Sequence, residues 1–494
     1  MDEKEINESA QPVSENDDIN RKKWYQLITV EPTLFLYMMA FMLTSVIENV
    51  LFVYKACTVN HGYSHEICME IEKHADIKTE VQKTTSTFFQ NNSIAGQVIP
   101  IILAFFIGAF SDRRGRKLPL IMGLIGKFIY SSMVVVNTTM TNWPVEYIIY
   151  TATIPSAFTG ADVAIFANAF SYISDVSTKE NRTLRITILD VCYLSTMPTG
   201  VFIGTYLYNN YLNKSFTKMF LINATLLFLS IIYSLVNLKW QTTAKQKPLT
   251  ELPCGKWLGD LFDKKHFVHS VRSVTKKREN NHRTYVVLIL AAMAFYAIQR
   301  DEKKYLYLYT QLKLDWTTEI YSNFRTYQSA SYVVVMLIAV PIFNKVLKWK
   351  DTIIVAIGAW GHSIGRVFFA TASSTALMYA GASISSFGPI VAPAIRSITS
   401  KLVSSDERGT VFSLLSVCDN AIQLVSGIFY TQIYNNTLKT FPEAMFLFTI
   451  FTQLCVFSII LYIHIKRRHE KDETTPPIDA LIEQQPQEEN TESK

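Results

Sequence analysis

Nine ionisable residues lie inside long apolar stretches of this sequence, where a charged side chain is costly unless it has a partner or faces water. They are Glu48, Lys127, Asp162, Asp190, Arg325, His362, Arg366, Arg396 and Asp419. A carboxyl group shielded from water can take up a proton, and a guanidinium can hold an anionic group with two hydrogen bonds. These side chains therefore indicate proton and anion binding in an apolar environment.

Asp190 and Arg396 are the strongest candidates, because they lie in opposite halves of the chain and a short way inside their apolar segments. Both positions are compatible with a central cavity. A buried guanidinium needs a partner, and none is obvious near Arg396 in its own segment. For Lys127, His362 and Arg366 we favour a structural role, or a side chain that reaches back to an interface.

Membrane-spanning helices must position these side chains. Of the 494 residues, 49% are hydrophobic and 18% are charged, and the apolar residues form blocks of about twenty, the length with which a helix crosses a bilayer. Twelve spans are predicted, at 32–54, 86–110, 117–137, 145–172, 184–208, 216–238, 284–306, 321–345, 352–373, 374–398, 409–434 and 441–465. The sequence therefore predicts an all-α membrane protein with twelve transmembrane helices.

A polar stretch at 239–283 divides the spans into six and six. We expect a polar tail at 1–31, one helix bundle at 32–238, a central loop at 239–283, a second bundle at 284–465 and a disordered tail at 466–494. Basic residues collect in the loops on one side of the predicted bundles, which makes that side cytoplasmic. Both termini, the central loop and both tails are expected on the cytoplasmic side.

The opposite side carries the sequons at Asn137, Asn213 and Asn435, which are predicted glycosylation sites. Cys57 and Cys68 lie in one loop on that side and are a candidate disulfide, provided that the loop faces an oxidising compartment. The remaining cysteines lie in apolar or polar segments without such a partner nearby.

The strongest local motif is GAFSDRRGRK at 108–117, in the turn between the second and third spans. It matches the loop signature of the major facilitator superfamily and contains Gly108, Asp112, Arg113, Gly115, Arg116 and Lys117. Gly108 permits close helix packing and Gly115 a tight reversal, while Asp112 can pair with Arg116 or face a helix N-terminus. Such a network can hold one conformation of an alternating-access transporter.

From the first predicted span to the twelfth, the sequence resembles solute carrier family 46, which includes a proton-coupled folate transporter. The resemblance is carried by SDVSTKENRTLRITILD at 174–190, VAPAIRSITSKLV at 391–403, RGTVFS at 408–413 and SGIF at 426–429. It implies that Asp190 is the proton-linked acidic residue and Arg396 the substrate-site arginine. A second acidic residue of the family falls at or next to Asp162, and the family's loop aspartate and arginine fall on Asp112 and Arg116.

Two departures from the folate transporter bear on the solute. Its histidine in the seventh span has no counterpart between Thr284 and Gln299, and its glutamate in the fifth span is replaced by the shorter Asp190. The resemblance therefore does not imply folate, although proton-coupled chemistry remains compatible with it.

We expect a secondary active transporter that moves a small organic anion with protons, through a central site at mid-membrane. The sequence contains no G-x-x-x-x-G-K-S/T loop and no catalytic constellation, so neither an ATP-driven pump nor an enzyme is expected. We expect no cofactor, metal or nucleic-acid partner. The open alternatives are an uncoupled facilitative carrier and a non-transporting membrane receptor or scaffold, in the plasma membrane or an endolysosomal membrane.

Overall fold

The computed structural model describes residues 28–177, 182–243, 246–248, 259, 282–402 and 408–474. Within these ranges the secondary structure is helical and no strand is present. The chain divides into two compact units. Unit 1 comprises Met1–Leu51 and Ile99–Phe267, and unit 2 comprises Phe52–Val98 and Val268–Lys494.

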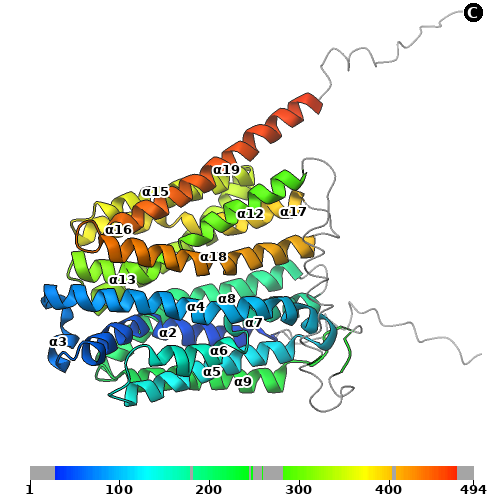
Figure 1. The fold of residues 1–494 in the computed structure, drawn as a ribbon. Coiled ribbons are helices and arrows are strands. Elements are labelled where there is room, and N and C mark those ends of the chain that lie inside the picture. The colour runs from blue at the N-terminus through cyan, green and yellow to red at the C-terminus, as the bar shows by residue number, and fades with distance from the viewer. Residues whose placement is uncertain are drawn as a thin grey trace, which may run out of the picture. The chain divides into compact units, whose positions relative to one another are not determined.

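The helices of unit 1 are drawn from blue to green in Figure 1. They are most of α2 (Glu31–Lys55), the second part of α4 (Ala75–Arg114), α5 (Lys117–Thr139), η4 (Ile149–Thr153), α6 (Ile154–Ala157), α7 (Ala161–Asp175), α8 (Arg182–Asn210) and α9 (Phe216–Asn237). Helix α5 packs against α7 and α9. Buried apolar residues such as Leu34, Leu124 and Ile165 form the core between α2, α5 and α7.

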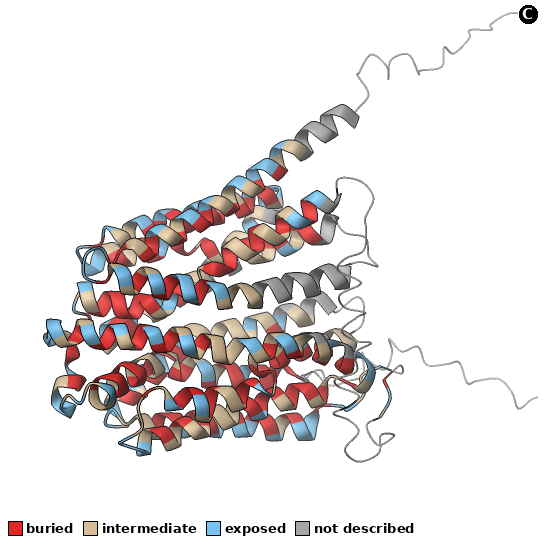
Figure 2. Ribbon diagram, in the orientation of Figure 1, coloured by how far each residue is buried: buried red, intermediate tan, exposed pale blue. Residues whose placement is uncertain are grey.

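Unit 2 contains the later helices and the segment 52–98, which covers the start of α4. Its elements are η2 (Ala56–Asn60), α3 (His65–Met69), η3 (Ile71–Lys73), α12 (His282–Ile298), α13 (Glu302–Lys313), α14 (Thr318–Pro341), η6 (Ile342–Val346), α15 (Asp351–Ala370), α16 (Thr375–Ser385), η7 (Gly388–Ile390), α17 (Val391–Leu402), α18 (Arg408–Thr437) and α19 (Ala444–Thr474). Helix α15 packs against α16 and α19, and its buried residues lie within an apolar core shared with α12 and α17. Figure 2 shows these inward faces in red.

Three predicted spans are interrupted in the structure. The span 145–172 is broken before α7, where Gly160 and Ala161 have φ values of 81° and 39°. The span 284–306 separates into α12 and α13, and the span 374–398 separates into α16 and α17 with the short 3-10 helix Gly388–Ile390 between them. Hydropathy averaged over a whole span does not reveal such breaks.

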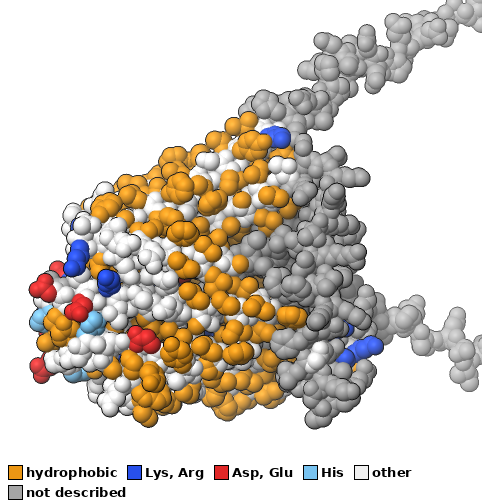
Figure 3. Space-filling view, viewed as in Figure 1, with side chains coloured by type: hydrophobic (Ala, Val, Ile, Leu, Met, Phe, Trp, Pro, Cys, Tyr) orange, Lys and Arg blue, Asp and Glu red, His pale blue; other side chains and the backbone are white. Residues whose placement is uncertain are grey.

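By length and hydropathy, eight helices of the described residues are apolar enough to cross a membrane, or nine if the bent pair in α4 is counted as one span. Figure 3 shows hydrophobic side chains along the sides of the helices on the visible face. The sequence pattern predicts twelve spans, whereas length and hydropathy of the described helices identify eight or nine. The count of twelve therefore stays a prediction.

Most of the two expected tails and of the expected central loop lies outside the described residues. The residues concerned are 1–27, most of 239–283, and 475–494. Helix α19 ends at Thr474, so it extends beyond the expected end of the second bundle at 465.

Candidate functional site

The loop motif of unit 1 is built around a turn that requires glycine. Gly115 has a φ of 108°, and a Cβ atom on it would lie 2.0 Å from the carbonyl oxygen of Trp240. Any larger residue would have to displace backbone as well as adopt a left-handed conformation. The chain can therefore reverse between the end of α4 and the start of α5 only with glycine at this position.

Arg116 connects three elements at this turn. It forms an ion pair with Asp112 of α4, and its Nη1 donates to Ser111 Oγ at 2.7 Å. Its Nε donates to Asp175 Oδ2 at the end of α7, at 3.0 Å. Asp175 also accepts a hydrogen bond from Thr242 Oγ1 at 2.9 Å. Of the two roles that the sequence allows for Asp112, the structure has the pairing with Arg116.

Lys117 fastens the start of α5 to the end of α9. Its side chain is buried, and Nζ donates to the carbonyl oxygens of Leu235 and Leu238, both at 2.7 Å. The ammonium also lies 4.4 Å from the centre of the Trp240 ring. These contacts make Lys117 a structural member of the motif, because two helix-end carbonyls that lack intrahelical partners are satisfied by one cation.

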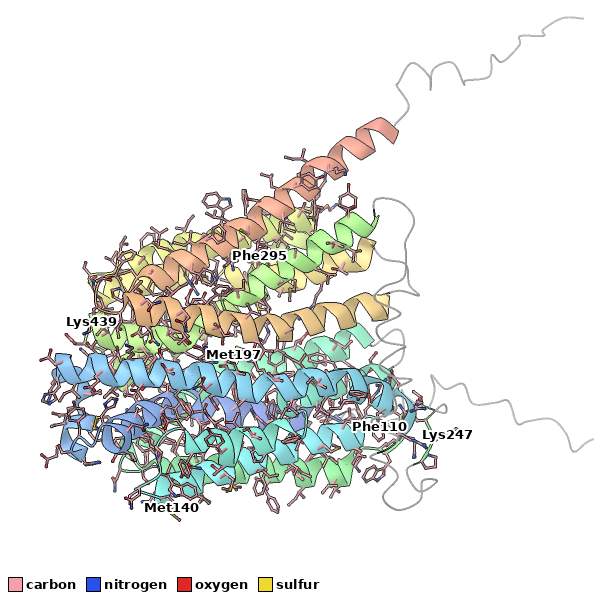
Figure 4. The ribbon with its side chains drawn as sticks, viewed as in Figure 1. Phe110, Met140, Met197, Lys247, Phe295 and Lys439 are labelled. Atoms are coloured by element: carbon pink, nitrogen blue, oxygen red, sulfur yellow. A yellow bond between two sulfur atoms is a disulfide. The ribbon has the colours of Figure 1, made fainter. Side chains whose placement is uncertain are left out.

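The other members of the motif contribute less. The carbonyl oxygen of Arg113 accepts from the backbone nitrogen of Lys247 at 2.8 Å, and Figure 4 shows Lys247 at the opposite end of unit 1 from Met140. No atom of the described residues lies within 4 Å of a Cβ atom built on Gly108, so the packing role expected for Gly108 stays a prediction. Gly108 lies on an exposed side of α4.

Asp162 belongs to a second charged group inside unit 1. Lys127 Nζ of α5 lies 2.9 Å from Asp162 Oδ1, and the hydroxyl of Tyr37 donates to the same carboxylate. Nearby on α2, Glu48 accepts from the hydroxyl of Tyr130. Three helices thus meet at an aspartate that begins α7 directly after the break at Gly160. The Asp162 side chain is 48% exposed, so it is accessible as well as paired.

Asp190 and Arg396 lie in different units. Asp190 is half-buried on α8, next to the fully buried Leu189. Arg396 is exposed on α17 and has no hydrogen bond or ion pair with the residues that the structure describes. An exposed guanidinium that forms no ion pair within the described part of the chain can bind an anion. The side chain of Asp419, another sequence candidate, lies outside the described residues.

A charged group that sequence reasoning missed lies in unit 2, at the break between α12 and α13. Glu302 pairs with Arg366 of α15, with Nε 2.8 Å from Oε1. One position earlier, Asp301 pairs with Lys304 at 3.0 Å. The run Arg-Asp-Glu-Lys-Lys at 300–304 is visible in the sequence, but it stands near the end of the predicted span 284–306, where flanking charges are common.

The start of α4 joins unit 2 through polar side chains. Gln82 is buried, donates to the carbonyl oxygen of Leu308 at 3.0 Å and accepts from the hydroxyl of Tyr434 at 3.0 Å. Lys78 Nζ lies 2.6 Å from Asp315 Oδ1. Amide and hydroxyl contacts of this kind are common between membrane helices, and each contributes on the order of 1 kcal/mol or less.

The loop before α4 contains a disulfide between Cys57 and Cys68, whose Cα atoms are 5.8 Å apart. The three sequons differ in accessibility. Asn213 is exposed in a turn, whereas Asn435 is half-buried and donates to Thr87 Oγ1 at 3.3 Å. Asn137 is fully buried, and its amide donates to Met133 O and Thr151 Oγ1, both at 2.8 Å. The side-chain nitrogen of Asn137 is therefore enclosed and hydrogen-bonded in the folded protein, and a glycan on it stays a prediction.

Comparison with known proteins gives one family match. The model of the Major Facilitator Superfamily matches residues 33–427. Among curated relatives, the lysosomal proton-coupled steroid conjugate and bile acid symporter SLC46A3 of Gallus gallus is 25% identical over 88% of this chain and 93% of its own length. The proton-coupled folate transporter of Bos taurus is 23% identical over 77% of this chain and 82% of its own length.

A third relative is the probable peptidoglycan muropeptide transporter SLC46 of Drosophila melanogaster, 22% identical over 88% of this chain and 85% of that protein. Among solved structures, a peptide transporter POT in complex with sulfate superposes with a TM-score of 0.61 at 15% identity, covering 89% of this chain and 95% of that one. The human organic anion transporter MFSD10 gives a TM-score of 0.60 at 12% identity, over 87% and 97%. At such identities these structures establish the likeness of fold alone.

Proposed function

Because this chain belongs to the major facilitator superfamily, we propose that it is a member of solute carrier family 46 and a proton-coupled secondary transporter of a small organic anion. The observation that carries the proposal is the match to relatives along most of both chains, since two of these relatives are proton-coupled by name. Their solutes are steroid conjugates, bile acids and folate, which are organic molecules that bear or can bear a negative charge. An enzymatic activity is not part of the proposal.

In this proposal the twelve predicted spans cross the membrane and both termini are cytoplasmic. The membrane is the plasma membrane or an endolysosomal membrane, where a proton gradient is available to drive uptake or release. The basic turn of the loop motif, with Arg116 held between Asp112 and Asp175, then lies on the cytoplasmic side. Its contacts would change when the transporter alternates between its two open states.

We assign proton binding to Asp190, with Asp162 as a second acidic residue, and anion binding to Arg396. Asp162 forms an ion pair with Lys127, whose Nζ lies 2.9 Å from Oδ1. Asp190 is half-buried on α8. Arg396 supplies the planar donor pair that suits a carboxylate or sulfate.

The test is a solute-uptake screen in cells at acidic and neutral external pH, with steroid sulfates, bile acids, folates and muropeptides as candidate solutes. Asp190→Asn should abolish most of the stimulation by acid while the protein remains at the membrane. Asp76→Asn, at an exposed position of α4, is the matched control and should leave uptake unchanged. Arg396→Lys should weaken apparent affinity before it lowers maximal rate. Full acid stimulation in Asp190→Asn, or unchanged affinity in Arg396→Ala, contradicts the assigned roles.

A further inference from the structure

The helical span Thr284–Lys313 is interrupted near its middle, between α12 and α13. Interrupted membrane helices place charged side chains and helix ends at the depth where transported ions and solutes bind. Asp301 and Glu302 stand at this interruption, and they are 4% and 0% exposed. A carboxylate at such a depth requires partners, and the partners of the two residues differ.

Asp301 is held by a partner on its own helix. Lys304 Nζ lies 3.0 Å from Asp301 Oδ1, and the hydroxyl of Ser426 donates to Oδ2. Lys304 is itself one-third exposed and also donates to Ser93 Oγ at 2.7 Å. The ion pair between Asp301 and Lys304 lies within one helical turn, so a relative movement of α13 and α15 would not break it.

Glu302 depends on other helices. Its cation is Arg366 of α15, whose Nε donates to Oε2 at 3.2 Å. The hydroxyl of Thr449 on α19 donates to the same oxygen. Thr449 is in turn bonded to the hydroxyl of Tyr430 on α18, at 2.6 Å. The carboxylate is therefore shared among three helices, and a small relative movement of α13 and α15 would separate it from its counter-charge.

The surroundings of Glu302 are rich in positive charge. Lys303 of the same helix interacts electrostatically with Arg300, Arg325 and Arg366 as well as with Glu302. Four other titratable groups of the described residues interact with this site. They are Tyr321 and Tyr332 of α14, Tyr430 of α18 and His362 of α15. Glu302 is thus the internal counter-ion of a cationic cluster.

Three members of the cluster have unused hydrogen-bonding capacity. Among the described residues, Glu302 Oε1, Arg366 Nη1 and both ring nitrogens of His362 have no hydrogen-bond partner. Arg366 and His362 are 3% and 2% exposed. The His362 ring is held instead by packing against Gly388, where an added Cβ would lie 2.1 Å from Nδ1. Arg366 can therefore accept a second anionic partner without first giving up every bond it makes.

We propose that Glu302 is a second proton acceptor of the transport cycle, which gives up Arg366 to an anionic group and takes a proton when it does so. The proton adds to the carboxylate, the ion pair with Arg366 breaks, and the guanidinium keeps its charge and turns to the anion. Charge in the cluster is conserved, because one anion replaces another and the proton neutralises the first. This proposal rests on the proposed function, to which it adds a coupling residue in unit 2.

Infrared difference spectroscopy of the purified full-length protein in lipid nanodiscs tests the proposal without a known solute. Stepwise acidification should produce the carbonyl band of a protonated carboxyl group that is absent from Glu302→Gln and present in Asp190→Asn. In Arg366→Gln the same band should appear at a higher pH, because the cation that favours the ionised form has been removed. Absence of any Glu302-dependent band, down to the lowest pH at which the protein remains folded, overturns the proposal.

If Glu302→Gln does not fold, Thr449→Val provides a second test. This variant keeps the carboxylate and Arg366 but removes one hydrogen bond to Glu302. The carboxyl band should then shift in frequency, and an unshifted band would contradict the assignment to Glu302. The outcome is separate from that of the uptake screen. Acid-stimulated uptake without a Glu302 band supports the proposed function and excludes Glu302 as a proton acceptor. A Glu302 band without uptake of any solute supports protonation of Glu302 and contradicts the proposed function.

Discussion

Replacing Asp175 by alanine should destabilise the protein far more than replacing Asp112, although both carboxylates pair with Arg116. The Asp112 side chain is 64% exposed, and ion pairs in that setting contribute about 0–1 kcal/mol. Asp175 is only 19% exposed and accepts from Arg116 Nε at 3.0 Å. A charge-assisted hydrogen bond of this kind contributes about 1.5–3 kcal/mol.

The second bond of Asp175, from Thr242 Oγ1, adds less, because Thr242 can retain its contact with Gln246 Oε1 at 3.2 Å. We therefore expect Asp175→Ala to cost about 2–3 kcal/mol and Asp112→Ala at most about 1 kcal/mol. With about 2–4 °C of Tm per kcal/mol for units of this size, the shifts are about 4–12 °C and at most about 4 °C. Scanning fluorimetry of the purified variants measures both. Equal shifts, or a larger one for Asp112→Ala, would refute this reading of the network.

Asp112→Ala should still slow transport more than it lowers surface abundance, since the pair is proposed to hold one conformation rather than the fold. Solute binding should survive in this variant. Loss of binding affinity with an unchanged conformational equilibrium, measured by labelling of single cysteines on the two sides, would exclude the locking role.

Three further outcomes follow from buried contacts. Lys117→Met should lower Tm by several degrees, because two helix-end carbonyls lose a shared donor at about 1–3 kcal/mol per unsatisfied group, and Lys117→Arg should recover part of the loss in the same fluorimetry. Cys57→Ser with Cys68→Ser should cost about 3 kcal/mol for an eleven-residue separation, and a reductant should lower the Tm of the wild type but not of this variant. Asn213→Gln should increase the electrophoretic mobility of the protein, as treatment of the wild type with glycosidase should. Asn137→Gln should leave the mobility unchanged, because the Asn137 amide is buried. A mobility change in Asn137→Gln would show that this amide is accessible during synthesis.

Hydropathy predicted the approximate positions of the long helices that the structure describes, because a membrane span is a long and strongly apolar pattern. The count of twelve spans stays a prediction. Hydropathy could not predict the interruptions before Ala161 and at Gln299–Asp301. In these places the apolar average continues while the backbone turns. The charged run at 300–304 marked one interruption, but only its position between two helices shows that its carboxylates point inward.

Contacts within one helical turn were also predictable. Asp112 and Arg116 are four residues apart, the spacing at which side chains on a helix meet. Asp175 is 59 residues from Arg116, and Arg366 is 64 residues from Glu302, so these pairs depend on how the helices pack. The burial of Asn137 has the same cause, since a sequon records a short pattern and not the enclosure of its nitrogen by Thr151.

The most direct test of the transport proposal is solute accumulation by the purified protein in proteoliposomes under an imposed proton gradient. The solute is the one identified by the uptake screen, and the internal and external concentrations are measured over time. Proton coupling predicts accumulation above the external concentration when the outside is acidic, collapse of that accumulation on addition of a protonophore, and none of it in Asp190→Asn. Equilibration of the solute to equal concentrations, at the same rate with and without the gradient, would contradict the account and indicate an uncoupled carrier.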